Sequence, residues 1–338
     1  MKRVAKITDK IMIHPFNSPK AISQALFRCR FIPAALVLTT MMLFGTYLIR
    51  PAYGEGVSAS FLYNLSDFSG VVPFNMVKMF ADRTRHEVYV VDSDGSVRIF
   101  NAAGMETYRF NEDGSLGNII DAVVDKEGNI LALVANVTKN PLIRCNYRGD
   151  LMGTLELKNI PAGFSPDSMA YNDGHIYLVN KNTLQVVVTD DQGSFERSID
   201  LFDTAGGNSK HKLDYEMGGF SVDREGNIFF TLPIQFKAYK LSPDGKVASF
   251  GQPGGAAGKF NIAAGIVTDG SGHYFVSDKL KSSILVFNRE FTFLTQIGTR
   301  GYGPGGLVVP TEMAIMDNQL YVTQSAQKGV SVFSLKQQ

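Results

Sequence analysis

The sequence predicts an all-β fold, a six-bladed β-propeller built from four-stranded blades. Three observations lead to it. Apolar residues alternate with a period of two through residues 57–338, no long helical pattern follows residue 56, and one turn-and-strand motif recurs six times at spacings of 42 to 52 residues. A propeller blade takes about 40–50 residues. With 338 residues, 44% of them hydrophobic, the chain can bury a sizeable core.

The recurring motif is an acidic residue, a glycine turn and then an apolar strand. It is clearest at 125–130 (DKEGNI), 223–228 (DREGNI) and 269–274 (DGSGHY). The first apolar residues of the six copies are Val88, Ile130, Ile176, Ile228, Tyr274 and Leu320. A second column of inward apolar positions follows 12 to 15 residues later, at Phe100, Cys145, Val188, Leu241, Phe287 and Phe333. Two columns in one register predict repeated blades.

The last copy lacks a fourth strand, and the start of the repeat region supplies a candidate for it. Residues 61–66 (FLYNLS) resemble 293–298 (FLTQIG), the outer strand of the fifth copy. We therefore expect an N-terminal strand to complete the last blade, which would close the ring and leave no open edge there.

The N-terminal segment differs from the rest in charge. Residues 1–54 hold eight basic residues and one acidic residue, a net charge of +7, whereas the remainder carries −6. Residues 31–49 contain no charge, and residues 1–30 form a basic leader that we expect in the cytoplasm. Residues 31–54 are therefore a signal peptide ending near Gly54 or a transmembrane anchor, and both interpretations stay open. Either places residues 57–338 outside the cytoplasm, in the periplasm or envelope.

The propeller region resembles the NHL-repeat family. The residues that carry the resemblance are 251–260 (GQPGGAAGKF), 265–269 (GIVTD), 275–278 (FVSD) and 284–287 (ILVF), followed by 298–306 (GTRGYGPGG). The whole of 57–338 is similar to the six-bladed propellers that bacteria export. The resemblance implies that four residues brace backbone amides: Asp92, Asn180, Asp278 and Gln324, each four positions after the first apolar residue of its copy.

Candidate ligand residues lie where the innermost strand of each blade begins, since propellers often bind ligands at that end of the channel. By register these candidates are Lys78, Asp121, Asp167, Ser168, Glu216 and Glu312. An acidic ring with one lysine could hold a divalent cation or a polar ligand. No Cys or His spacing indicates a metal site, so no cofactor is identified and any metal ligands are unknown. His86, His175 and His273 occupy equivalent turn positions in separate blades, which should keep them apart.

The sequence shows no convergent catalytic set, and this favours a non-enzymatic role. The first hypothesis is a monomeric binding module for an envelope protein, a glycan or a redox partner. The alternative is a metal-dependent hydrolase or lyase acting at the channel mouth. A net charge of −6 on residues 55–338 disfavours nucleic acid as a partner. If residues 31–49 are not cleaved, they would bind the membrane.

Overall fold

The structure is a computed structural model that describes residues 56–73, 76–136, 141–207, 215–325 and 328–337. All of the described residues belong to one compact unit, residues 53–338. The predicted leader and the predicted signal peptide or anchor at 31–54 lie outside the described residues. None of the described helices is long and apolar enough to cross a membrane.

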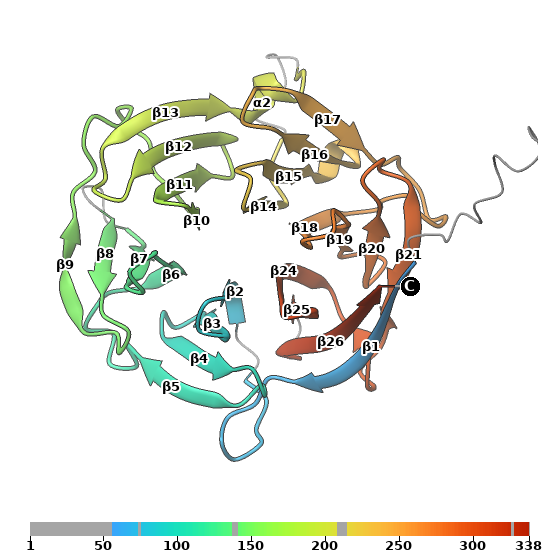
Figure 1. Ribbon diagram of the computed structural model, residues 1–338, viewed down its shortest axis with the longest axis horizontal. Helices are drawn as coiled ribbons and strands as arrows, with labels where there is room; N and C mark the ends of the chain where they lie inside the picture. Colours follow the sequence, from blue (N-terminus) through green and yellow to red (C-terminus); the bar gives the residue numbers. More distant parts are fainter. Residues whose placement is uncertain (1–55, 74–75, 137–140, 208–214, 326–327, 338) are drawn as a thin grey trace, which may run out of the picture. The chain divides into compact units, whose positions relative to one another are not determined.

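Six four-stranded antiparallel sheets are arranged in a ring, as Figure 1 shows. The first three blades are β2 Met76–Asp82, β3 Glu87–Asp92, β4 Val97–Asn101 and β5 Glu106–Phe110; β6 Ile119–Val124, β7 Ile130–Val134, β8 Leu142–Cys145 and β9 Leu151–Leu155; and β10 Ser168–Asn172, β11 His175–Asn180, β12 Gln185–Asp190 and β13 Phe195–Asp200. The last three are β14 Gly219–Val222, β15 Ile228–Leu232, β16 Lys237–Leu241 and β17 Val247–Phe250; β18 Ala263–Thr268, β19 Tyr274–Asp278, β20 Ser283–Phe287 and β21 Phe293–Ile297; and β24 Pro310–Met316, β25 Gln319–Gln324, β26 Val330–Gln337 and β1 Val57–Asn64. The six-bladed, four-stranded architecture predicted from the repeats is confirmed.

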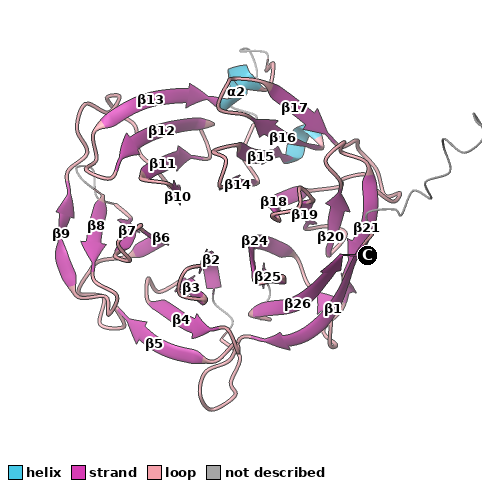
Figure 2. Cartoon of the chain, in the orientation of Figure 1, coloured by secondary structure: helices cyan, strands magenta, loops and turns pink. Residues whose placement is uncertain are grey.

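Helical and parallel elements are minor in the described chain (Figure 2). The short helix α2 (Leu201–Thr204) begins the insertion after the third blade, and a 3-10 turn, η2, spans Pro233–Gln235. Asp200 caps α2 because its carboxylate accepts the backbone N–H groups of Phe202 and Asp203. The parallel pair β22 (Thr299–Arg300) and β23 (Gly306–Leu307) lies between the fifth and sixth blades.

The two apolar columns fall on the second and third strands of the blades. Val88 faces Phe100, and the equivalent residues face each other in the second, fourth, fifth and sixth blades. The third blade differs by one residue, because Thr189 lies opposite Ile176 and Val188 lies opposite Tyr177. Thr189 is fully buried, so in this blade the position equivalent to Phe100 holds a polar residue. A search for apolar residues alone therefore selects Val188 instead.

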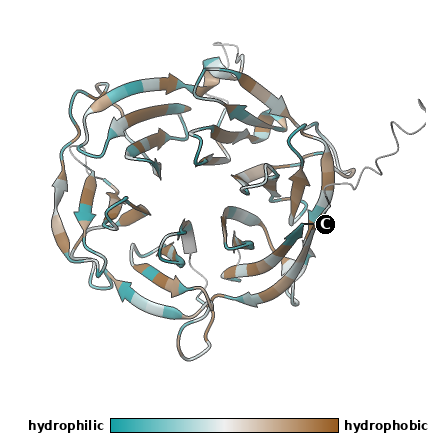
Figure 3. Ribbon diagram, viewed as in Figure 1, coloured by the Kyte–Doolittle hydropathy of each residue, from teal (hydrophilic) through white to brown (hydrophobic). Residues whose placement is uncertain are grey.

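Each second strand buries both of its faces, one against each neighbouring blade. In β3, Tyr89 and Val91 pack with the second blade, whereas Val88 and Val90 pack with the sixth. Successive side chains of a strand point to opposite sides, so a continuous apolar run is what this position requires. Six apolar clusters formed in this way, one at each joint between blades, hold the ring together. Figure 3 shows these apolar residues along the strands.

The outer strand of the last blade comes from the other end of the described chain. β1 pairs antiparallel with β26, with Val57 opposite Gln337 and Asn64 opposite Ser331. The rings of Phe61 and Phe333 meet edge to face, with centroids 5.8 Å apart.

The first strands of the fourth, fifth and sixth blades approach one another backbone to backbone. A Cβ on Gly219 would lie 2.4 Å from the Ala264 carbonyl oxygen, and one on Gly265 would lie 2.3 Å from the Thr311 oxygen. Only glycine fits at these two positions. These two glycines therefore let the first strands of the fourth, fifth and sixth blades approach one another closely.

Candidate functional site: the channel mouth

The central channel contains a cavity of about 750 Å³, lined by the first strands of the blades and the turns that follow them. Strands alternate in direction, so the starts of the first strands and the loops after the second strands share one face of the ring, called here the mouth face. Lys78, Asp121, Ser168 and Glu312 line the cavity near that face.

These four side chains form one hydrogen-bonded network with Lys181. The Lys78 ammonium donates to Glu312 Oε1 at 2.8 Å and to Ser168 Oγ at 3.1 Å. The Ser168 hydroxyl donates to Asp121 Oδ2 at 2.9 Å. The Lys181 ammonium donates to the same Glu312 oxygen at 3.2 Å. The network joins residues from the first, second, third and sixth blades.

Burial and pairing act in opposite directions on the charges of this network. Burial is the largest influence on Glu312 and favours its neutral form, but Lys78 and Lys181 outweigh it and lower the pKa of Glu312 to about 2. Burial also opposes the charge of Lys78, yet Glu312 and Asp121 raise its pKa. Burial lowers the pKa of Lys181, and the nearby Lys78 adds to that effect. Burial raises the pKa of Asp121 despite the proximity of Lys78.

Asp167 adjoins the network through the backbone. Its Oδ2 accepts the Lys181 N–H at 2.9 Å, while its Oδ1 is buried with no hydrogen-bond partner among the described residues. Burial raises the pKa of Asp167. An unpartnered buried carboxylate oxygen has a free capacity to accept a hydrogen bond.

Glu216 is placed apart from the other five predicted residues. It is exposed, and it does not belong to the lining of the cavity. The first strand of the fourth blade begins only at Gly219, and its glycines pack against the fifth blade. That strand therefore brings no side chain to the mouth.

Lys181 is the residue that the sequence analysis missed. It follows Asn180, in the loop after the second strand of the third blade. The available signal was topological: a loop after a second strand lies on the same face as the start of a first strand. The lysine after Asn180 was thus a candidate for the mouth.

The predicted bracing residues hold several of these loops. Asp278 is fully buried, and its carboxylate accepts the N–H groups of Asn261, Ile262, Leu280 and Lys281. Asn180 Oδ1 accepts two amides of its own loop. Gln324 Oε1 accepts the Val308 N–H at 2.7 Å. Asp92 instead pairs with the side chain of Arg98 at 2.6 Å.

The histidines do not form a shared site. His86, His175 and His273 contact three different carboxylates, those of Asp317, Glu196 and Asp269. In the described part of the chain, no group of three or more His, Cys, Asp or Glu side chains could hold a metal ion. The divalent cation considered from the sequence therefore has no three-residue ligand set there.

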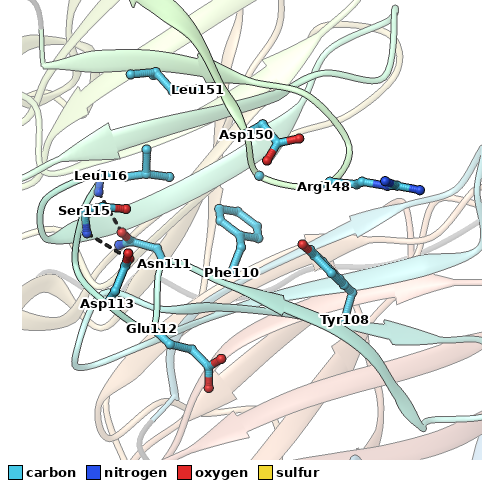
Figure 4. Close-up of a pocket in the computed structure, with 11 residues that line it drawn as sticks. Tyr108, Phe110, Asn111, Glu112, Asp113, Ser115, Leu116, Arg148, Asp150 and Leu151 are labelled. Carbon is cyan, nitrogen blue, oxygen red and sulfur yellow. Dashed lines mark hydrogen bonds between the residues drawn. The ribbon is translucent and has the colours of Figure 1, made fainter.

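A second cavity, of about 650 Å³, lies between the outer parts of the first two blades (Figure 4). Its polar side chains are largely used for local structure. Asn111 Oδ1 accepts the Leu116 N–H at 2.8 Å, and its amide donates to the carbonyls of Gly95 and Gly117. The channel mouth, where charged groups of four blades converge, is the stronger candidate for a binding site.

Comparison with known proteins supports the same architecture. A family described as a 6-bladed beta-propeller matches residues 263–338. This range holds the whole fifth blade and the strands β24, β25 and β26 of the sixth. No curated protein matches the chain.

Solved structures resemble the chain at the level of fold. A Bacteroides thetaiotaomicron protein is 11% identical with a TM-score of 0.61, covering 83% of this chain and 76% of its own. The virginiamycin B lyase of Staphylococcus aureus is 12% identical with a TM-score of 0.55, covering 83% and 99%. A candidate gluconolactonase is 12% identical with a TM-score of 0.56, covering 86% and 97%. At such identities the likeness concerns the propeller fold alone.

Proposed function

We propose that this chain is an extracytoplasmic, NHL-like propeller that binds a neutral polar ligand, of the glycan class, at the channel mouth without catalysing a reaction. The observation that carries the proposal is the convergence of Lys78, Asp121, Ser168 and Glu312 on one end of a cavity of about 750 Å³, where Lys181 joins their network through Glu312. A site of this size, with a few convergent polar groups, suits a small ligand.

The balance of charges at the mouth favours a neutral ligand. Two lysines, Lys78 and Lys181, face the carboxyl groups of Asp121, Asp167 and Glu312. Both lysines pair with Glu312, and burial raises the pKa values of the two aspartates. An added anion or cation would meet groups of its own sign. Hydroxyl groups can donate to the carboxylates and accept from the ammonium groups.

The cavity wall also supplies apolar surface beyond the mouth. Phe80, Met169, Phe220 and Met313 line it. The C–H faces of a sugar pack against side chains of this kind, while its hydroxyls reach the polar network. A glycan uses both parts of the lining.

The test is a thermal-shift series on the full-length protein with maltooligosaccharides and chitooligosaccharides. A ligand at 100 times its dissociation constant should stabilise the fold by about 2.7 kcal/mol. Lys181→Gln should abolish the shift, because it removes one of the two ammonium groups at the mouth. The fold should be retained, because Glu312 keeps Lys78 as its partner. Lys246→Gln is the matched control, since Lys246 is a highly exposed lysine paired with Asp244. Equal shifts in both variants would place the ligand elsewhere, and no shift in the native protein would argue against a glycan.

The alternative is a hydrolase or lyase working at the same mouth. Burial raises the pKa of Asp121 and lowers that of Lys181, so a carboxyl group and an amino group of altered acidity stand near each other. The solved structures of similar fold include a virginiamycin B lyase and a candidate gluconolactonase. Turnover of a cyclic ester that is lost in Asp121→Asn, but not in Lys246→Gln, would favour this alternative. No turnover of lactones or cyclic depsipeptides would count against it.

A further inference from the structure

The mouth face carries a second feature, away from the channel. Ile262, Leu280 and Tyr302 are apolar or aromatic side chains with exposed fractions of 39%, 53% and 74%. They belong to the linkers before β18 and β24 and to the loop between β19 and β20. Lys279, Lys281 and Arg300 lie among them in the sequence. We call these six residues the docking patch.

Hydrogen bonds show that the docking patch is continuous. The Lys279 N–H donates to the Ile262 carbonyl at 3.0 Å. The Arg300 guanidinium donates to the Leu280 carbonyl. The Lys281 ammonium donates to the Ala256 carbonyl at 2.7 Å, which ties in the glycine-rich linker. Three loops from neighbouring blades thus form one braced surface, with Asp278 beneath holding two of them.

The charge of the docking patch is uncompensated. Among the described residues, none of Lys279, Lys281 and Arg300 forms a salt bridge. The neighbouring Lys328 is held by the carbonyls of Gly301 and Gly303 and also lacks a carboxylate partner in the described chain. Asp278, whose carboxylate lies next to two of these loops, is buried and occupied by four amides.

The loops at the first blade on the same face have the opposite character. The loop after β3 and the linker after β5 carry Asp94, Glu112 and Asp113, of which Glu112 pairs with Arg109 at 2.6 Å. The mouth face is therefore polarised, acidic on one side and basic with exposed apolar tips on the other. A large anionic surface would meet the docking patch and be repelled by the acidic side, which sets one orientation.

We propose that the docking patch seats the propeller on an anionic lipid surface. Lysines and arginines are attracted to acidic head groups, and apolar tips flanked by them enter the head-group region. Leu280 between Lys279 and Lys281 has this pattern, and Tyr302 is a side chain suited to the membrane interface. The proposal depends neither on the segment at 31–49 nor on the ligand at the channel mouth.

The test measures contact at the patch itself in the full-length protein, because residues 1–49 could bind vesicles on their own. Hydrogen exchange is followed by mass spectrometry with vesicles of phosphatidylglycerol or of phosphatidylcholine. Protection is expected at 278–283 and 299–307 with phosphatidylglycerol alone, and not at the turn 101–106. A double variant, Lys279→Gln with Lys281→Gln, should lose that protection, whereas Lys240→Gln with Lys246→Gln should keep it.

Two results would overturn the proposal. One is unchanged exchange at 278–283 and 299–307 when phosphatidylglycerol vesicles hold the protein. The other is protection of these loops by polyglutamate but not by vesicles, which would indicate an acidic protein as the partner. Loss of protection in the double variant is interpretable only if its melting temperature matches that of the native protein, so both are measured together.

Discussion

Lys78 in the first blade and Glu312 in the last form an ion pair of 2.8 Å across the joint where the ring closes. Their side chains are 15% and 19% exposed, and Lys181 reaches the same Glu312 oxygen from the third blade. One carboxylate thus balances two lysines. This shared dependence leads to the first two predictions.

Replacing Glu312 by Gln should destabilise the propeller by about 3 kcal/mol at neutral pH, because it leaves two largely buried ammonium groups without their main partner. Urea unfolding measures the loss, and Glu290→Gln, an exposed turn residue, serves as control. A variant as stable as the native protein would show that the ion pair contributes nothing net.

The contribution of Glu312 should also depend on pH. The folded-state pKa of Glu312 lies at about 2, below the ordinary 4.5, so its stabilisation is present above pH 4.5 and is lost as the pH falls toward 2. The raised pKa values of Asp121 and Asp167 act in the opposite sense. The difference in the free energy of unfolding between the native protein and the Glu312→Gln variant isolates the contribution of Glu312. It should shrink from about 3 kcal/mol at pH 6 to near zero at pH 2; a constant difference would contradict the assignment.

Phe61→Ala should weaken the last blade by about 2 kcal/mol, because the Phe61 ring packs on Phe333 in the joint between the fifth and sixth blades. The neighbouring Leu62 is the matched control. The ladder between β1 and β26 shifts register at Leu62, and its side chain is 41% exposed. Leu62→Ala should change stability by less than about 0.5 kcal/mol. Equal effects of the two substitutions would mean that β1 contributes little packing.

Asp278→Ala should cost about 3 kcal/mol, because it leaves the backbone N–H groups of two loops without their buried acceptor. Hydrogen exchange should rise first at 261–262 and 280–281. Asp244→Ala, at an exposed turn, should leave the unfolding midpoint unchanged. Uniform exchange throughout the variant would contradict a local bracing role.

Cys145 should be unreactive in the folded protein. Its side chain is fully buried, and burial raises the pKa of its thiol to about 11. In a Cys29→Ser background, a thiol reagent at pH 8 should label the protein only after unfolding. Labelling of the native chain at the rate of a free thiol would refute this.

The blades could be predicted from the sequence because their causes are local. The motif at 125–130 combines an acidic turn residue, a glycine and an apolar strand. In the structure Asp125 accepts the amides of Glu127 and Asn129 while Gly128 adopts a φ of 88°. The apolar run that follows must be buried on both faces. Local patterns of this kind repeat visibly at 42 to 52 residues.

The candidate site was only partly predictable. Counting from the first apolar residue of each copy located Lys78, Asp121, Ser168 and Glu312, because the first strands keep their register from blade to blade. It failed at Glu216, because the fourth blade starts with glycines that close on the fifth. It also overlooked Lys181, which belongs to a loop.

The sequence by itself therefore determined the number of blades, their strands and the acidic residues of their glycine turns. Only the tertiary structure decided which polar residues meet. Lys78 and Glu312 are 234 positions apart, and their contact depends on ring closure. Whether Lys181 balances the same carboxylate depends on side chains reaching across the channel from the third blade. Alternation and turn chemistry act over a few residues, whereas the electrostatics of a channel mouth depend on distances set by the whole ring.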